Sequence, residues 1–151
     1  MRILVTVNIN PKTKGAYDIQ AAYRDIDSVG WSKKSLEKKN VKVGDIVYLF
    51  LCEPIRKIKY KCIITNTNAD PKTIPDDSKY YLTDRDESDS TDSCYVFKKI
   101  EEIDDNRLDF EHLKKVMGWS LKATSFRGAY NDEGKCKRLF DYIDSIVNDN
   151  L

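Results

Sequence analysis

The stretch GWSKKSLEKKNVKVGDIVYLFLCEPIRKIKYKCIITN, residues 30–66, contains the clearest signals of secondary structure in this chain. The Gly44–Asp45 pair is a turn signal, and the segment that follows it is apolar on both alternating faces. We expect that segment to be a central strand. After a turn at Glu53, apolar residues alternate with lysines through 57–66, which predicts an antiparallel partner strand with one core face and one cationic face.

Toward the N-terminus, the pattern predicts one strand and one helix. Apolar and polar residues alternate through residues 3–9, as in a strand, and the alternation stops at Asn10. Apolar residues then recur at helical spacing in AYDIQAAYRDID, with Asp18 well placed near the helix start. A short helical turn is expected after Trp31, with Ser32 as its cap.

Toward the C-terminus, residues 67–93 are rich in Asp, Ser and Thr and show little periodicity, so we expect a long acidic loop. Its DRDESDSTD piece has carboxylates at spacings like those of a calcium loop but lacks the glycine and glutamate that such a loop requires. Strand character returns in 94–103, and LDFEHLKKVMG predicts a helix that ends at Gly118. A loop or strand and a closing helix over 135–147 follow.

The composition describes one soluble globular domain. The chain has 151 residues, of which 40% are hydrophobic and 34% charged, so residues 1–151 can form a single domain with a sizeable core. Mostly antiparallel strands with helices between them imply an α+β domain with a small curled sheet. The apolar run at the N-terminus is too short for a signal peptide or a membrane span, so we expect a cytoplasmic protein.

The residues that catalysis usually requires are scarce. The chain has one histidine, His112, and its four cysteines show no zinc-ligand spacing, so we expect no metal and no cofactor. Phosphate-loop, dinucleotide-binding and metalloprotease motifs are missing from the sequence. We therefore predict that the protein is not an enzyme, and a hydrolase acting on nucleic acid ranks last among the functions considered.

Aromatic and basic residues instead favour nucleic-acid binding. Trp31 and Trp119 are each followed by serine, and an aromatic ring can stack on a base that has been flipped out of a helix. Lysines close to Trp31 would hold the phosphates; they are Lys33, Lys34, Lys38 and Lys39. The alternative, that both tryptophans are core anchors and the lysines a solvated helix face, is the more common situation for such residues.

The order AYDIQAAYRDIDSVGW, VKVGDIVYLFLCEPIRKIKYKCIITN, LKKVMGWSLKATSFRG resembles the EVE-type domains of the PUA-like superfamily, which are related to YTH and ASCH domains. The most specific part is Trp31 followed by Val43-Gly44-Asp45-Ile46-Val47-Tyr48. The resemblance implies a compact, mixed or antiparallel β-barrel with helices packed around it. It also implies a pocket between barrel and helices that receives a modified base without catalysing a reaction.

The same resemblance implies where the ligand would bind. Trp31, Ser32 and Tyr48 would belong to the pocket, and Asn8 and Asn10 at the end of the first strand would read a base edge. Trp119, Ser120 and Arg127 would close the pocket, with Arg127 meeting a phosphate. The ligand would be DNA or RNA, and the sequence leaves the base, its modification and the strandedness open.

Two departures from the family pattern keep a second function open. Relatives have Gly-Pro-Arg where this chain has Gly128-Ala129-Tyr130, and the acidic 67–93 loop would repel a nucleic-acid backbone if it folded over the lysines. The alternative is a protein-interaction or defence-associated module. Its acidic loop would contact a protein partner such as a nuclease or restriction-type component.

Overall fold

The computed structural model describes residues 1–83, 93–120, 122–123, 126 and 128–150, apart from the side chains of Ser35 and Glu37. Arg127 and the 84–92 part of the predicted acidic loop, including the calcium-like piece, lie outside the described residues. The strands and α-helices run β1 (Arg2–Val7), α1 (Ile19–Asp25), β2 (Ser28–Ser32), β3 (Ile46–Leu51), β4 (Lys57–Ala69), β5 (Cys94–Glu102), α2 (Phe110–Met117), β6 (Ala129–Asn131) and α3 (Lys137–Asp149).

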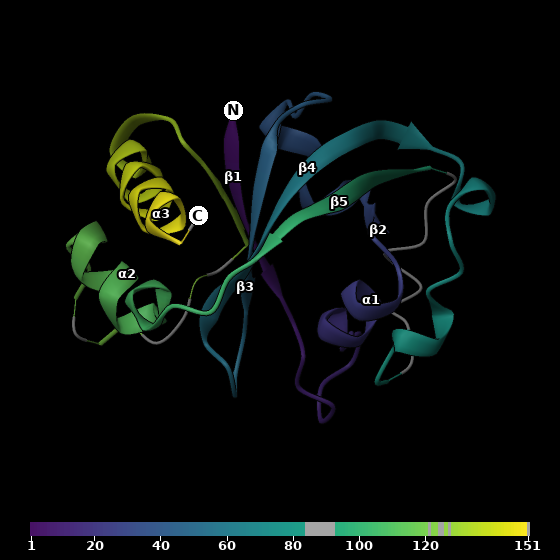
Figure 1. Ribbon diagram of the computed structural model, residues 1–151, viewed down its shortest axis with the longest axis horizontal. Coiled ribbons are helices and arrows are strands. Elements are labelled where there is room, and N and C mark those ends of the chain that lie inside the picture. Colours follow the sequence, from purple (N-terminus) through teal and green to yellow (C-terminus); the bar gives the residue numbers. More distant parts are fainter. Residues whose placement is uncertain (84–92, 121, 124–125, 127, 151) are drawn as a thin grey trace.

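The strands form one mixed sheet in the order β2-β5-β4-β3-β1-β6 (Figure 1). The predicted hairpin is confirmed, since β3 and β4 pair antiparallel beside each other at its centre. Gly44 has a φ of 94° in the turn before β3, a conformation that side-chain-bearing residues rarely adopt. The only parallel pair among the described strands joins β1 to β3, an arrangement that local sequence patterns did not predict.

The sheet curves strongly, but the strand pairing does not close it into the predicted barrel (Figure 1). The strands at its two ends, β2 and β6, are not paired with each other in the described residues. The short β6 pairs only with Ile3, Leu4 and Val5 of β1. Among the described residues, the C-terminal part of β1 therefore has no strand partner on that side, and the sheet is open there.

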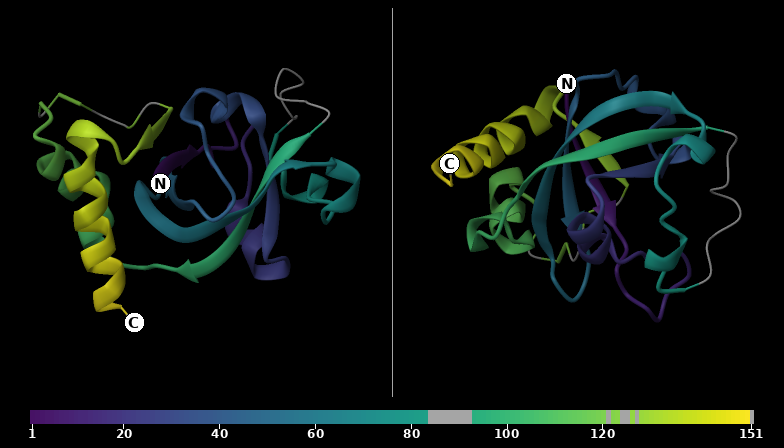
Figure 2. Two further views of the ribbon diagram at one scale, coloured as in Figure 1. Left: turned by 90° about the horizontal axis from the view of Figure 1, so that it is seen from above. Right: turned by 45° about the vertical axis from the view of Figure 1, so that its right-hand side comes forward.

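The hydrophobic residues form two main clusters on opposite faces of the sheet. Inside the curve, sheet residues such as Leu49 and Phe97 pack with Tyr23 of α1. On the outside, Phe50 of β3 packs with residues of α2 and α3 such as Phe140. Figure 2 shows α2 and α3 together on one side of the sheet, while α1 lies on the other.

Local signals set the ends of the two predicted helices α1 and α2. The carboxylate of Asp18 accepts a hydrogen bond from the Ala21 N–H at 3.1 Å, as predicted for the start of α1. Asp109 caps α2 in the same way, accepting from the His112 N–H at 2.9 Å. The helix ends at Gly118, whose φ of 68° confirms the predicted C-terminal glycine.

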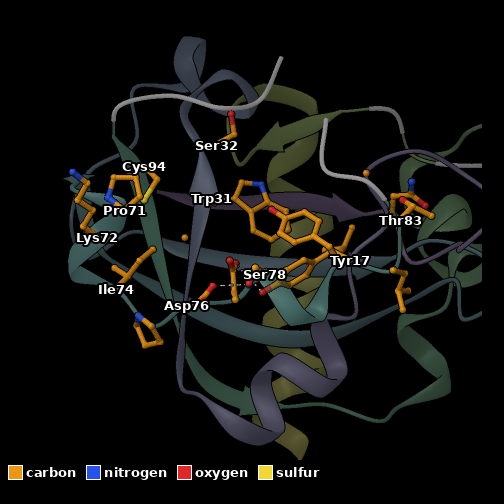
Figure 3. A pocket seen from close by; sticks show the side chains of 18 of the residues that line it. Tyr17, Trp31, Ser32, Pro71, Lys72, Ile74, Asp76, Ser78, Thr83 and Cys94 are labelled. Carbon is orange, nitrogen blue, oxygen red and sulfur yellow. Dashed lines mark hydrogen bonds between the residues drawn. The ribbon is translucent and has the colours of Figure 1, made fainter. Parts of the chain in front are cut away.

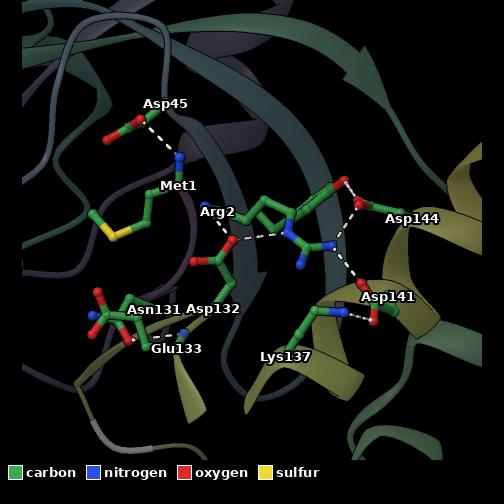
Figure 4. A network of polar contacts seen from close by, with 10 residues as sticks. Met1, Arg2, Asp45, Asn131, Asp132, Glu133, Lys137, Asp141 and Asp144 are labelled. Atoms are coloured by element: carbon green, nitrogen blue, oxygen red, sulfur yellow. Dashed lines mark hydrogen bonds and ion pairs between the residues drawn. The ribbon is translucent and has the colours of Figure 1, made fainter.

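An ion-pair network fastens α3 to the sheet (Figure 4). The Arg2 guanidinium of β1 lies 3.0 Å from Asp132 and 3.0 and 2.8 Å from Asp141 and Asp144 of α3. Burial opposes the charge of Arg2, but hydrogen bonds to these three carboxylates outweigh it and raise the arginine's pKa. Charge pairing and apolar packing thus act together on this face. No helix in the described part of the chain is long and apolar enough to cross a membrane.

Two sequence expectations need correction. Trp31 lies within strand β2, and the helical turn predicted after it is a short 3-10 turn. The predicted cap of that turn is confirmed, because Ser32 Oγ accepts a hydrogen bond from the Lys34 N–H at 3.3 Å. The first part of the expected loop is ordered structure, because β4 continues to Ala69 and Tyr80 is buried. Apolar side chains within the acidic segment reach the core, which its composition conceals.

Candidate functional site

A cavity of about 910 Å³ lies where the sheet fails to close (Figure 3). One side is formed by Thr6, Val7 and Asn8 at the end of β1, and another by Gly30, Trp31 and Ser32 of β2. Residues of the 71–83 segment line the outer side together with Gly15, Tyr17 and Cys94; we call this segment the acidic wall because its carboxylates Asp76 and Asp77 belong to the lining, although it also carries Lys72 and Lys79. The strands β1 and β2 are distant in the sheet order, so the cavity exists only because the sheet curves.

Trp31 is both a core residue and a cavity residue. Its ring stacks on Phe97 of β5, with centroids 5.3 Å apart and an angle of 23° between the ring planes. The residue is only partly buried and lines the cavity. Because the contact with Phe97 fixes the orientation of the ring, Trp31 presents a preformed aromatic surface to a ligand.

Tyrosine side chains line the same cavity as Trp31, and Figure 3 shows Tyr17 among them. The rings of Tyr17 and Tyr81 meet edge to face with centroids 4.9 Å apart, and Tyr17 Oη donates a hydrogen bond to Asp77 Oδ2 at 3.0 Å. Burial, and next the charge of Asp77, raise the pKa of Tyr17 far above its ordinary value. Tyr17 therefore remains protonated and acts as a hydrogen-bond donor at neutral pH.

Hydrogen bonds hold the acidic wall against the N-terminal part of the chain. The Asp18 N–H donates to the Tyr80 carbonyl at 2.7 Å, and the Leu82 N–H donates to the Ala16 carbonyl at 2.9 Å. The hydroxyl of Tyr80 donates to Asp25 Oδ2 at 2.8 Å. These bonds tie the wall to both ends of the segment that carries α1.

The wall also approaches β2 very closely. A Cβ atom on Gly30 would lie 2.5 Å from the Cδ1 atom of Ile74 and 3.1 Å from the sulfur of Cys94. The 2.5 Å distance means that any side chain at position 30 would collide with Ile74 unless Ile74 shifted. Glycine at position 30 therefore allows the wall to close over the edge of β2.

The electrostatic character of the cavity differs from the sequence expectation. Its described lining carries two carboxylates, Asp76 and Asp77, and one ammonium group, Lys72. The backbone N–H of Ser78 donates to Asp76 at 2.9 Å, and this bond lowers the pKa of the Asp76 carboxyl. Part of the predicted acidic loop therefore lines the cavity, whereas the predicted repulsion of a phosphate backbone stays a prediction.

The two predicted amide ligands occupy different positions. Asn8 lines the cavity, but its Nδ2 donates to Thr13 Oγ1 at 2.6 Å and its Oδ1 accepts from the Asn10 N–H at 3.1 Å. Asn10 is not part of the lining, and its side-chain oxygen accepts from the Lys12 N–H at 3.0 Å. Both amides stabilise the turn after β1, so in this structure they are not turned toward a base edge.

Tyr48, Trp119 and Ser120 lie outside the cavity, contrary to prediction. Tyr48 is 1% exposed on the outer face of β3, where its hydroxyl donates to Asp144 of α3. Trp119 packs in the same outer cluster, and Ser120 Oγ accepts a hydrogen bond from the Lys122 N–H at 3.2 Å. Side chains alternate between the faces of a strand, so Tyr48 points away from the side where Trp31 packs.

The four predicted phosphate-binding lysines do not line this cavity. Lys33, partly buried next to Trp31, donates to Asn68 Oδ1 at 2.6 Å, and the neighbouring Lys34 is exposed. Lys38 and Lys39 instead line a second cleft of about 350 Å³ near Met1, Lys42 and Asp45. These lysines therefore lie outside the lining of the cavity that contains Trp31.

Sequence reasoning missed Tyr17, Gly30, Tyr81 and Asp77, which shape the cavity with Trp31. The only signal for Tyr81 was a pair of tyrosines inside a polar segment, and nothing local connected it to Tyr17. Among the described residues, no group of three or more His, Cys, Asp or Glu side chains could hold a metal ion.

This curved mixed sheet with helices on both sides is similar in fold to the ASCH protein from Zymomonas mobilis. A variant of the ASCH protein from Zymomonas mobilis is 9% identical, with coverage of 96% of this chain and 97% of that chain and a TM-score of 0.54. No protein-family model and no curated protein matches the chain by sequence.

Two further solved structures share the fold across almost the whole chain. A protein from Pseudomonas putida is 12% identical, and the alignment covers 97% of this chain and 99% of that chain with a TM-score of 0.56. A protein from Pseudomonas syringae is 13% identical, with coverage of 95% and 99% and a TM-score of 0.54. These likenesses show a shared fold alone, and the EVE and PUA-like resemblance remains a prediction.

Proposed function

We propose that this protein is a nucleic-acid-binding domain that inserts one base into the cavity between β1 and β2. The observation that carries the proposal is the Trp31 ring, which is fixed against Phe97 and lines a cavity of about 910 Å³. A volume of this size suits a small-molecule or nucleotide ligand. An aromatic surface in a cavity at a sheet edge is a stacking platform for an unpaired base.

The surrounding charges support the same function. Lys34, Lys38 and Lys39 are paired with no carboxylate within the described residues, so their ammonium groups can contact phosphates. They follow Trp31 directly in the chain. A nucleic-acid backbone along these lysines would leave the acidic wall facing the inserted base.

In this proposal the protein reads its ligand without chemical change. The EVE resemblance adds that the base is a modified one, in DNA or RNA. The ASCH and PUA-like fold of the solved neighbours agrees with a binding role, and the chain's own cavity supplies the place where binding would occur.

Fluorescence titration tests the proposal. In a Trp119→Phe variant the remaining tryptophan, Trp31, reports directly on the cavity, since Trp119 packs on the other face of the sheet. Short DNA and RNA oligonucleotides, with and without methylated cytosine or adenine, are titrated at two salt concentrations. We expect quenching that weakens as salt rises. Unchanged fluorescence with every oligonucleotide, at both salt concentrations, would refute the proposal.

A further inference from the structure

We infer that the cavity selects an uncharged aromatic ring bearing an exocyclic amino group, as in cytosine or adenine, and excludes phosphate. This inference rests on the proposed function and names the part of the nucleic acid that enters the site. It is carried by two features of the described cavity: the free edge of β2 at Gly30 and the two carboxylates of the acidic wall, Asp76 and Asp77.

The register of β2 determines which of its backbone groups face the cavity. The Lys99 N–H donates to the Asp27 carbonyl at 2.8 Å, directly before the paired residues Ser28 and Lys98. In an antiparallel pair, hydrogen-bonded residues alternate with residues whose backbone groups point the opposite way. Asp27 is a hydrogen-bonded residue, so every second residue after it is also bonded to β5. Gly30 falls between two such residues, and its N–H and C=O therefore point away from β5.

Gly30 thus offers a donor and an acceptor side by side on an edge strand that lines the cavity. An amino-bearing base has a matching edge, with a ring nitrogen that accepts and an amino group that donates. The missing side chain at position 30 keeps this edge accessible, since a Cβ there would already collide with Ile74. Trp31, the next residue, lies where it can contact the face of the same ring.

The acidic wall adds the selectivity that a backbone pair alone lacks. Uracil could also pair with one N–H and one C=O, but carboxylates favour ligands that donate hydrogen bonds, as aspartate does with the cytosine amino group. Asp76 and Asp77 supply such acceptors, and Tyr17 orients Asp77. The same two negative charges oppose a phosphate, and Lys72 is the one cation in the described lining.

Nucleosides and nucleotides separate these effects. Cytidine, adenosine, uridine and cytidine 5′-monophosphate are titrated into the Trp119→Phe protein, with Trp31 fluorescence as the readout. We expect uridine and the monophosphate each to bind about tenfold more weakly than cytidine. Equal affinity for cytidine and uridine, or tighter binding of the monophosphate, would overturn the inference.

An Asp77→Asn substitution in the same protein tests the wall. An asparagine still accepts from Tyr17 but carries no charge and can itself donate, so both preferences should fall to about threefold or less. Asp149→Asn is the matched control, because Asp149 lies on α3 and pairs with Arg107 at 3.3 Å. Preferences that persist in Asp77→Asn, or that disappear equally in Asp149→Asn, would count against the wall as the selective element.

NMR spectroscopy of the backbone amides tests whether Gly30 pairs with the base. In amide NMR spectra, cytidine should shift the Gly30 signal and slow its hydrogen exchange, while Val29, bonded inward to β5, changes little. A Gly30 signal that ignores a bound nucleoside would overturn the edge-pairing part. If oligonucleotides quench Trp31 but no base preference exists, only this inference fails; if neither oligonucleotides nor nucleosides bind, the proposed function fails with it.

Discussion

The two faces of the sheet are covered in different ways. On the outer face, the amphipathic helices α2 and α3 form a continuous apolar cluster with the sheet, in which Phe140 is fully buried. On the inner side, α1 covers the middle of the curve, but the opening beside β2 is covered only by the acidic wall. One face is sealed by apolar packing, and the other retains a cavity.

This difference between the coverings of the two faces explains why the cavity lies on the inner side of the sheet. Apolar side chains on regular helices fill the space between layers almost completely, as in other protein interiors. The acidic wall is held by the buried ring of Tyr80 and by hydrogen bonds of the same residue, and these contacts set its position without filling the space in front of Trp31. Each face also holds one tryptophan, so substitutions can separate stability from binding.

The largest effect is expected on the sealed face. Phe140→Ala should lower the free energy of unfolding by about 3–5 kcal/mol, because it removes a fully buried ring and leaves a cavity between α3 and the sheet. Urea denaturation followed by circular dichroism measures this loss. A decrease below about 1 kcal/mol would mean that packing of α3 contributes little, and the contrast between the two faces would not hold.

On the open face, Trp31→Ala should affect binding more than folding. We expect oligonucleotide binding to weaken by about 1–3 kcal/mol, the usual contribution of a stacked base. Fluorescence anisotropy of a labelled oligonucleotide measures the change without relying on tryptophan. Trp119→Phe is the control and should bind normally, since Trp119 belongs to the outer cluster; similar losses in both variants would argue that neither ring touches the ligand.

The inner cluster should respond to alkaline pH. Burial raises the pKa of Cys62 to about 12, whereas an unfolded thiol titrates near about 8.5. The resulting stability is complete below the unfolded value and decreases as pH rises toward 12, by about 1.4 kcal/mol per pH unit, because the unfolded state then binds fewer protons. Denaturation at pH 8, 9 and 10 measures the slope.

A Cys62→Ala variant serves as the reference for that slope. At neutral pH it should be less stable than the parent because it leaves a small cavity, but its stability should decline less between about pH 9 and 10. Burial also raises the pKa of Tyr60 to about 12, so part of the decline above pH 10 remains. Parallel curves for the two proteins would show that Cys62 stays protonated in the unfolded state or ionises in the folded one.

The smallest effect is expected at the surface next to Trp31. Replacing exposed Lys34 with Gln should change the free energy of unfolding by less than about 0.5 kcal/mol. If Lys34 contacts a phosphate, the slope of log affinity against log salt should decrease by about 0.7–0.9. Lys135→Gln, in the 3-10 turn before α3, is the control. An equal change in its salt slope would mean that the nucleic-acid phosphates do not bind specifically at Lys34.

Local patterns predicted most of the regular elements. The alternation after Gly44 and through residues 57–66 identified the β3–β4 hairpin, and Asp18 and Gly118 marked helix ends that the structure confirms. These signals act over a few residues, through turn conformation, side-chain periodicity and capping. A sequence therefore displays them without knowledge of the rest of the fold.

Local patterns could not assemble the site. Asn8, placed by resemblance at a base edge, instead has its amide bonded within the turn after β1, and Tyr48 points to the outer face. Trp31 was identified, but its neighbours Tyr17 and Asp77 come from segments far away in the chain. Their proximity depends on the curvature of the whole sheet.

Local sequence patterns were enough to predict the α+β class, the central hairpin and the helix ends, and they singled out Trp31, which lines the cavity. Three features became visible only in the tertiary structure: β1 runs parallel to β3, the described sheet is open beside β2, and the acidic wall covers this opening. The physical reason is the range of the interactions. Turns, caps and periodicity are encoded between near neighbours, whereas a cavity between β1 and β2 exists only after segments 60 or more residues apart have packed together.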